Sequence, residues 1–276
     1  MDPIRFPDFA PGTVWLVGAG PGDPGLLTLH ARHALELADV VLHDALVEPA
    51  ILALCGPHAR VEPVGKRAGK GGAKQLRIQD RLVQLARQGL RVVRLKGGDP
   101  LVFGRGGEEM RALAAAGVPF RVVPGVTAGV GALAYAGIPT THRGIGQAVA
   151  FATGHGAAGH APEVDWAGLA RSAPTLVIFM GLNRLDALAA EFLTAGRTAD
   201  EPVALIADAT TPRQQVVRTT LAAAPSAARA LPSEAAVLIA IGPVVGLADG
   251  WSGLQATTPA TIATPAAPLA ATGSSS

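Results

Sequence analysis

Short apolar runs alternate with longer amphipathic runs along the first 120 residues, and this alternation most strongly constrains the fold. Buried-strand patterns occupy residues 13–18, 40–43, 60–64 and 91–96. Apolar residues at helical spacing occupy 26–38, 74–89 and 108–117. Because strands that alternate with helices favour parallel pairing, the sequence predicts α/β architecture with a largely parallel sheet in this half.

The second half contains more strand patterns than helical ones. The expected strands are residues 120–125, 148–153, 175–181, 203–207, 214–221 and 236–242. One clear helical pattern covers 184–196, and the close spacing of the last strands predicts some antiparallel pairing. We therefore expect two α/β domains, residues 12–119 and 123–248, joined near Val118–Val123. Residues 251–276 are rich in Ala, Thr, Pro and Ser without apolar periodicity, which predicts a disordered tail.

Charge and composition exclude several classes of partner. The net charge of +2 is too small to indicate a polyanion, and 4% aromatic residues argue against a surface on which nucleic-acid bases stack. A single cysteine excludes an intrachain disulfide and a cysteine-based zinc site, and the seven histidines are scattered. The first twelve residues lack the apolar core of a signal peptide, and no apolar run is long enough to span a bilayer. We expect a cytoplasmic protein with no metal, nucleic-acid or membrane partner.

The first strand pattern leads into a glycine-rich turn, "LVGAGPGDPGLLTL" at residues 16–29. A dinucleotide-binding turn requires glycines at its first, third and sixth positions. Gly18 and Gly20 meet the first two requirements, but Asp23 occupies the third, and Pro21 lacks a backbone N–H. Asp44, after the second strand, could imitate the ribose-binding acid of such sites. An NAD(P)-dependent dehydrogenase therefore stays as an alternative from a different class.

Further motifs accompany this turn in a fixed order. They are "KGGDPLVFGRGGEE" at 96–109, "VPGVTAG" at 123–129, "AGIPTTHR" at 136–143, "TGH" at 153–155 and "FMG" at 179–181. Together they closely resemble the tetrapyrrole methylase family over residues 14–246. The resemblance implies a homodimer of two α/β domains with S-adenosylmethionine in the cleft between them.

Within that family, "GRGGEE" and "TTHRG" favour members that act on uroporphyrinogen III. The implied reaction is two successive C-methylations that give precorrin-2, as in siroheme or cobalamin-type biosynthesis, with S-adenosylhomocysteine as the by-product. Three alternatives stay open inside or near the family. They are a methyltransferase for a later precorrin, a diphthamide-pathway methylase, which should lack these strings, and a carrier that binds the macrocycle without methylating it.

The resemblance also implies roles for individual residues around the cofactor. Gly97, Gly98 and Asp99 would hold its amino-acid end, because a carboxylate can pair with an ammonium and glycines allow close approach. The other expected cofactor contacts are Pro21 beneath it, the pair Thr127 and Ala128, Met180 near the adenosine, and the backbone of Ala204 at the adenine.

A second set of residues is expected at the substrate. Arg105 and Arg143 would anchor its carboxylates, because arginine grips a carboxylate bidentately. Glu108 would assist charge or proton movement. The other expected members are Asp44 and Leu46 near the active cleft, Phe103 beside the substrate, and the further cations Lys66 and Arg67.

Overall fold

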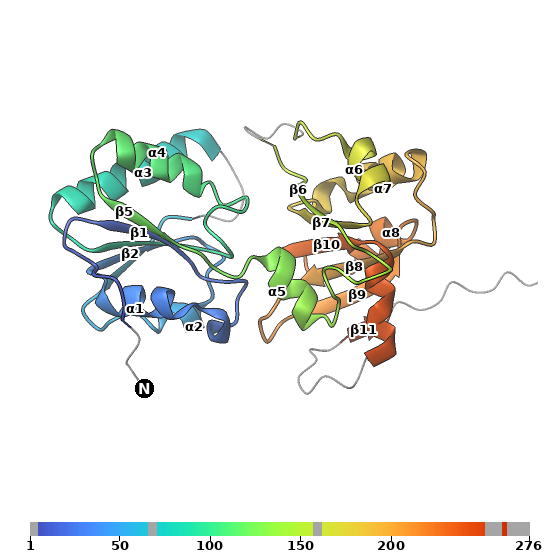
Figure 1. Cartoon of the computed structure of the whole chain (residues 1–276), viewed down its shortest axis with the longest axis horizontal. Helices are drawn as coiled ribbons and strands as arrows, with labels where there is room; N and C mark the ends of the chain where they lie inside the picture. Colours follow the sequence, from blue (N-terminus) through green and yellow to red (C-terminus); the bar gives the residue numbers. More distant parts are fainter. Residues whose placement is uncertain (1–4, 66–70, 157–161, 252–260, 264–276) are drawn as a thin grey trace, which may run out of the picture.

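Two separate β-sheets organise the chain (Figure 1). The computed structural model describes residues 5–65, 71–156, 162–251 and 261–263. The first sheet has the strand order β3-β2-β4-β1-β5, and every neighbouring pair in it is parallel. Its strands are β1 (Val14–Gly18), β2 (Val40–His43), β3 (Arg60–Pro63), β4 (Val92–Lys96) and β5 (Phe120–Val123). The predicted parallel sheet is therefore confirmed.

Helices cover both faces of the first sheet. On one face lie α1 (Leu29–Leu37) and α2 (Pro49–Leu52), and on the other lie α3 (Gly71–Arg87) and α4 (Gly106–Ala115) (Figure 1). Side chains of β1 alternate between the two cores: Trp15 and Val17 pack in the core beneath α1, whereas Val14 and Leu16 pack beneath α3. Because both faces are covered, all five residues of β1 are buried.

The second sheet has the order β11-β9-β8-β10-β7-β6 and mixed pairing. The strand β8 pairs antiparallel with β9 and β10, and β10 pairs antiparallel with β7, so the predicted antiparallel content is confirmed. The strands are β6 (Val149–Thr153), β7 (Thr175–Phe179), β8 (Pro202–Ala207), β9 (Gln215–Thr220), β10 (Val237–Ile241) and β11 (Thr261–Ala263). Its helical elements are α5 (Ala128–Tyr135), α6 (Trp166–Ser172), η3 (Leu182–Arg184), α7 (Leu185–Thr194), α8 (Ala224–Ala228) and η4 (Pro243–Trp251).

Three features differ from the expectation. The chain changes sheets after β5, because β5 pairs with β1; the junction expected at Val118–Val123 therefore lies one strand too early. The helix α5, which follows that change, was not predicted. Most of the expected tail lies outside the described residues, but Thr261–Ala263 pairs with β9 as β11. Among the described residues, no helix has the length and apolar character needed to cross a membrane.

Candidate active site

Three glycines meet at the carboxyl edge of the first sheet, where the loops after β1, β4 and β5 converge. A Cβ atom on Gly18 would lie only 2.5 Å from the amide nitrogen of Gly125, and one on Gly125 would overlap the carbonyl oxygen of Gly98. Gly20 and Gly98 also exchange two backbone hydrogen bonds, of 3.1 and 2.7 Å. In open α/β sheets ligands bind outside the carboxyl ends of the strands, so this edge is the natural place for a site.

Asp99 ties two of these loops together. Its half-buried carboxylate accepts a hydrogen bond of 3.1 Å from the amide of Gly125 and one of 2.8 Å from the amide of Leu101. A carboxylate can accept about four hydrogen bonds, so the capacity to pair with an ammonium remains. The neighbouring Gly97 has no atom within 4 Å of the position where a Cβ would stand, and that side of the loop faces open space.

The helix α5 begins beside the same loop and lies between the two sheets (Figure 1). The amide nitrogen of Ala128, its first residue, is 3.7 Å from the position of a Cβ on Gly98. The N-cap residue Thr127 makes no side-chain capping hydrogen bond. A helix N-terminus concentrates N–H donors and positive potential, and this one therefore suits an anionic group such as a carboxylate.

Glycines on α5 allow it to touch both halves of the chain. A Cβ on Gly131 would lie 2.8 Å from the ring of Pro21 in the turn after β1, and one on Gly129 would lie 3.0 Å from the rings of Phe151 and Phe179 in the second sheet. The structure thus brings the expected cofactor residues Pro21, Gly98, Thr127 and Ala128 around one helix end.

Exposed apolar side chains border these loops. Phe103, from the loop after β4, places its ring 5.0 Å from that of Phe179, so the contact spans the two halves of the chain. Phe103 is 38% exposed and Met180, at the end of β7, is 53% exposed. Both have left-handed backbones with φ of 52°, a conformation that non-glycine residues keep mainly where the surrounding structure requires it. Such side chains are suited to cover a flat apolar ligand.

Ala204 does not reach this edge. It is fully buried in the middle of β8, between Ala240 of β10 and Arg218 of β9, so its backbone lies inside the sheet ladder. The loop at the end of β8 does reach the site: the carbonyl oxygen of Ala209 is 3.0 Å from the position of a Cβ on Gly22. A position at the strand end, rather than Ala204, is therefore available to a ligand.

The turn after β1 is held by Asp23 and Tyr135. The Tyr135 hydroxyl donates a hydrogen bond of 2.5 Å to Oδ2 of Asp23, while Oδ1 accepts one of 2.7 Å from the amide of Gly25. The hydrogen bond that Tyr135 donates to Asp23 raises the pKa of the Tyr135 hydroxyl. Asp23, at the position of the missing third glycine, thus fixes the turn to the end of α5.

We expect Tyr135→Phe to loosen this turn. The variant removes a hydrogen bond to a charged group at a half-buried position, which is worth about 1 kcal/mol. The affinity for S-adenosylhomocysteine, measured by calorimetry, should fall roughly fivefold. Ser172→Ala is the control, because its hydroxyl bonds only the carbonyl of Gly168 within α6. Equal affinities of Tyr135→Phe and the control would contradict this role for the turn.

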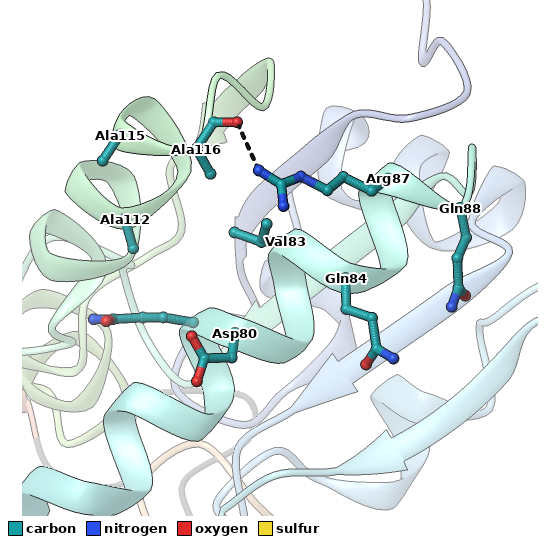
Figure 2. Close-up of a pocket in the computed structure, with 9 residues that line it drawn as sticks. Asp80, Val83, Gln84, Arg87, Gln88, Ala112, Ala115 and Ala116 are labelled. Carbon is teal, nitrogen blue, oxygen red and sulfur yellow. Dashed lines mark hydrogen bonds between the residues drawn. The ribbon is translucent and has the colours of Figure 1, made fainter.

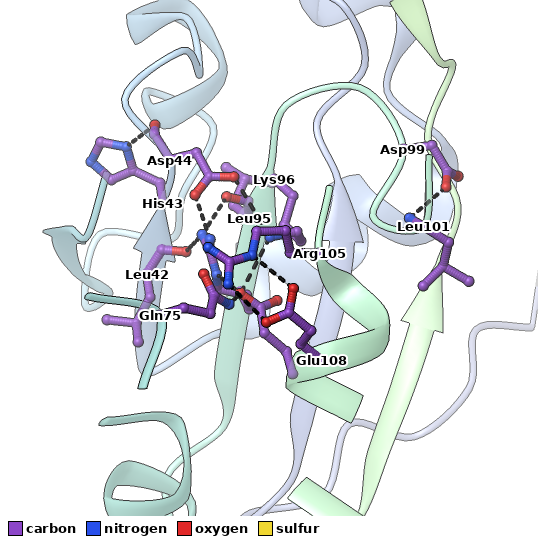
Figure 3. Close-up of polar contacts among 12 residues, drawn as sticks. Leu42, His43, Asp44, Gln75, Leu95, Lys96, Asp99, Leu101, Arg105 and Glu108 are labelled. Carbon is purple, nitrogen blue, oxygen red and sulfur yellow. Dashed lines mark hydrogen bonds and ion pairs between the residues drawn. The ribbon is translucent and has the colours of Figure 1, made fainter. Parts of the chain in front are cut away.

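A buried polar network lies beneath the expected active residue Asp44 (Figure 3). Arg94 and Lys96 lie two apart on β4, so both point to the same face, and each side chain is 2% exposed. Oε1 of the fully buried Glu109, on α4, accepts hydrogen bonds from Arg94 Nε at 3.0 Å and Lys96 Nζ at 3.3 Å. Asp44 forms the outer end: its carboxylate pairs with Arg94 and lies 3.7 Å from Lys96 Nζ.

Charge in this network is balanced by two cations and two carboxylates. Burial acts to lower the pKa of Arg94, but the carboxylates of Asp44 and Glu109 more than offset it, and the net shift is upward. Burial, and then the charge of Arg94, lower the pKa of Lys96. Sequence reasoning missed Arg94, Lys96 and Glu109. The available signal was the presence of charges at alternate positions of a strand buried on both faces.

Arg105 and Glu108 pair at the surface near this network. Two hydrogen bonds of 2.8 Å join Nε and Nη2 of Arg105 to the two carboxylate oxygens of Glu108. The hydrogen bond from Arg105 lowers the pKa of Glu108. A carboxylate held in this way is a weaker proton acceptor than a free one.

The remaining substrate candidates occupy separate loops. Leu46 is 56% exposed in the turn after Asp44. A Cβ on Gly65 would overlap the amide of Ala45, so the loop after β3 runs close to Asp44; Lys66 and Arg67, which follow it, lie outside the described residues. Arg143 is exposed in a loop closed by backbone hydrogen bonds between His142 and Gly146.

A surface hollow elsewhere on the chain is unrelated to these residues. It lies on the outer side of α3 and α4 and is lined by Gln79, Asp80, Val83, Gln84, Arg87, Gln88, Ala112, Ala115 and Ala116 (Figure 2). None of the expected cofactor or substrate residues belongs to it. The carboxyl edge of the first sheet is therefore the better candidate site.

Comparisons with known proteins identify the family of this chain. Residues 13–225 match the family model of Tetrapyrrole (Corrin/Porphyrin) Methylases. A uroporphyrinogen-III C-methyltransferase from a Sinorhizobium species is 52% identical over 251 residues, covering 90% of each chain. Siroheme synthase 3 from Aeromonas hydrophila is 51% identical over 88% of this chain, which spans only 52% of that longer protein. The crystal structure of uroporphyrin-III C-methyl transferase from Thermus thermophilus, complexed with S-adenyl homocysteine, superposes with a TM-score of 0.74, at 42% identity, over 85% of this chain and 99% of that one.

Proposed function

This chain belongs to the tetrapyrrole methylase family, and from that membership we propose that it methylates carbons of uroporphyrinogen III with S-adenosylmethionine, twice per substrate, giving precorrin-2. The observation that carries the proposal is the 52% identity to a uroporphyrinogen-III C-methyltransferase over 90% of both chains. The relative of known structure holds S-adenyl homocysteine, the product expected from such a donor. The enzyme is an S-adenosylmethionine-dependent methyltransferase.

The residues at the carboxyl edge fit the cofactor. Gly18 and Gly125 allow the loops after β1, β4 and β5 to pack closely, because a Cβ atom on either would collide with the backbone of a neighbouring loop, and the exposed side of Gly97 leaves the backbone open to a ligand. We assign Asp99, with Gly97 and Gly98, to the ammonium of the amino-acid end. The first amides of α5, after Thr127, are assigned to its carboxylate. When bound, S-adenosylmethionine supplies a methyl group on a positively charged sulfur.

The adenosine end has its own candidates on the second sheet. Pro21, packed against α5, and the exposed Met180 after β7 are assigned to its apolar surface, and the backbone at Ala209 replaces the Ala204 position. Because Met180 is 53% exposed, its thioether can pack against a flat ring without rearrangement of the core. These assignments leave Phe103, with its ring between the two halves, for the substrate macrocycle.

The chain contributes mainly orientation and charge to the reaction. The carbon–sulfur bond breaks as a carbon–carbon bond forms, and a proton then leaves the tetrapyrrole. Holding the reacting atoms in line can lower the barrier by ~7–11 kcal/mol. We assign Asp44 as proton acceptor, because its carboxylate is half-exposed at the outer end of the buried network. Arg105, Arg143 and Lys66 are assigned to the carboxylates of the substrate, with Leu46 at its edge.

Relatives also set the limits of the proposal. The chain spans about half of the siroheme synthase from Aeromonas, so only the methyl transfer is carried over from proteins of that name. We also propose a cytoplasmic homodimer, on the basis of the family resemblance, the single cysteine and the absence of an apolar run long enough for a membrane. Light scattering of the purified protein would measure the dimer directly.

One experiment tests the activity. The purified protein is incubated with uroporphyrinogen III and methyl-labelled S-adenosylmethionine, and added methyl groups are counted by mass spectrometry. We expect two methyl groups per macrocycle, together with calorimetric binding of S-adenosylhomocysteine and none of NADH. Macrocycle binding without methylation would instead identify a carrier, and methylation of a later precorrin alone would identify the rival activity within the family.

A further inference from the structure

Glu109 is a buried acid for which the proposed reaction has no direct use. Its side chain is fully buried, and its Oε1 accepts three hydrogen bonds, from Arg94, from Lys96 and, at 3.0 Å, from Nε2 of Gln75. Its Oε2 has no hydrogen-bonding partner within the described part of the chain. Removing a carboxylate from water costs free energy, so a buried glutamate at this position calls for a structural or functional explanation.

The contacts of Arg94 indicate that reason. Its guanidinium donates hydrogen bonds from Nε to Glu109, from Nη1 to the carbonyls of Leu42 and Leu95 at 3.4 and 3.2 Å, and from Nη2 to Asp44. The planar guanidinium of Arg94 is therefore held in one orientation. Glu109 fixes one end of it, and Asp44 accepts a hydrogen bond from the other end. Lys96 repeats the arrangement, because its ammonium lies between the same two carboxylates.

We propose that Glu109 is a positioning residue: through Arg94 and Lys96 it fixes the orientation of the Asp44 carboxylate and sets how strongly that carboxylate holds a proton. With Glu109 ionised, two carboxylates share two cations. Without its charge, Asp44 alone would face both cations and would hold a proton less readily. The inference deepens the proposed function, on which its catalytic consequence rests.

Among the described residues, the other charged and titratable groups near Asp44 do not duplicate this effect. His43, on β2, turns its Nδ1 to the carbonyl of Asp44 rather than to the carboxylate. Arg105, which precedes α4, and Glu108, in its first turn, are paired with each other and together add no net charge. Gln75, on α3, is neutral and contacts Glu109. Glu109 is thus the acid that balances Arg94 and Lys96 from within.

The test is the titration of Asp44 in the ligand-free full chain, followed by carbon-13 NMR of labelled aspartate carboxyls and assigned by the signal lost in Asp44→Asn. In Glu109→Gln we expect the titration midpoint of that signal to move to lower pH, because loss of one negative charge leaves both cations facing Asp44. Lys96→Met should move the midpoint up, and the double variant should return it close to wild type. Opposite shifts that cancel require charge balance, and a merely structural effect would not produce them.

A matched control lies in the second half of the chain. Glu201 also pairs with an arginine, Arg197, at 2.5 Å, and its buried Oε2 has no hydrogen-bonding partner among the residues that the structure describes. Glu201→Gln should leave the Asp44 midpoint unchanged. An unchanged midpoint in Glu109→Gln, or in Lys96→Met where Glu109→Gln does not fold, would overturn the inference.

Activity provides the second readout. In Glu109→Gln we expect kcat to fall roughly tenfold with little change in KM, and the acidic limb of its pH profile to move in the same direction as the NMR midpoint. If the variants shift the Asp44 midpoint as expected but the wild-type protein methylates no uroporphyrinogen III, the proposed function alone would be refuted. Normal methylation without the NMR shift would refute the role of Glu109 alone.

Discussion

Asp44→Asn should lower kcat for methylation of uroporphyrinogen III by about 10²- to 10⁴-fold, the range typical of a lost general base. Asparagine keeps the shape of the side chain and still faces Arg94, but it cannot take up a proton from the substrate. Binding of S-adenosylhomocysteine should change little, because Asp44 directly follows β2, whereas the residues assigned to the cofactor lie in the loops after β1, β4, β5, β7 and β8. Mass-spectrometric methyl counting and calorimetry on the same preparation measure both quantities.

Glu108→Gln provides the comparison that separates the two candidate bases. Its carboxylate is already paired with Arg105, so the variant should release Arg105 and lower substrate affinity more than kcat. If Glu108→Gln lost as much kcat as Asp44→Asn, and with a changed pH profile, Glu108 would be the proton acceptor. Full activity of Asp44→Asn would remove Asp44 from the reaction.

Gly125→Ala should weaken binding of S-adenosylhomocysteine by roughly tenfold to a hundredfold. The added methyl group would overlap the carbonyl oxygen of Gly98, and backbone atoms of Gly18 also lie within 3 Å of its position. Because all the obstructing atoms are backbone, the loops after β1, β4 and β5 must separate. Overpacking of this kind costs about 1–3 kcal/mol or more, and each 1.4 kcal/mol directed at the site is about tenfold in affinity. Calorimetry and thermal unfolding measure the two effects.

Alanine variants of two further glycines serve as comparisons for Gly125→Ala. Gly98→Ala meets no atom closer than 3.7 Å but has a left-handed backbone with φ of 65°, so it should show a smaller loss that comes from strain. Gly246→Ala, exposed in η4, makes only an ordinary contact of 3.7 Å with Pro202 and should bind like wild type. Equal binding by Gly125→Ala and Gly246→Ala would contradict the close approach of the three loops.

Periodicity in the sequence predicted most strands of both sheets, because most are short apolar runs bounded by turn residues, but it placed β11 in a disordered tail. It missed α5, the helix on which the candidate site depends. The segment "AGVGALAY" contains two glycines and has no polar face, so neither propensity nor amphipathic pattern indicates a helix there. Contacts with Pro21, Phe151 and Phe179 supply the stability that local preference lacks.

Some site residues could be predicted from the sequence and others could not. Motif strings led to the glycine loops, Asp99, Thr127 and Asp44, all of which lie on or beside the carboxyl edges of strands. Arg94 and Lys96 were hidden inside a strand pattern, because a pattern does not show which charges will be buried together. Ala204 was misplaced for the opposite reason: it occupies a strand interior, whereas the neighbouring loop at Ala209 lies at the strand end.

The double attachment of α5 has a consequence for any attempt to divide the protein. Its residues Ala132 and Leu133 complete the core of the second sheet, while its first turn rests on the loops of the first. A fragment that stops before α5 would lose the support of its glycine loops, and one that starts after it would expose an apolar face. Neither half is therefore expected to keep its native structure when produced alone. A chimera that exchanges one half between relatives would have to include α5 together with both of its contact surfaces.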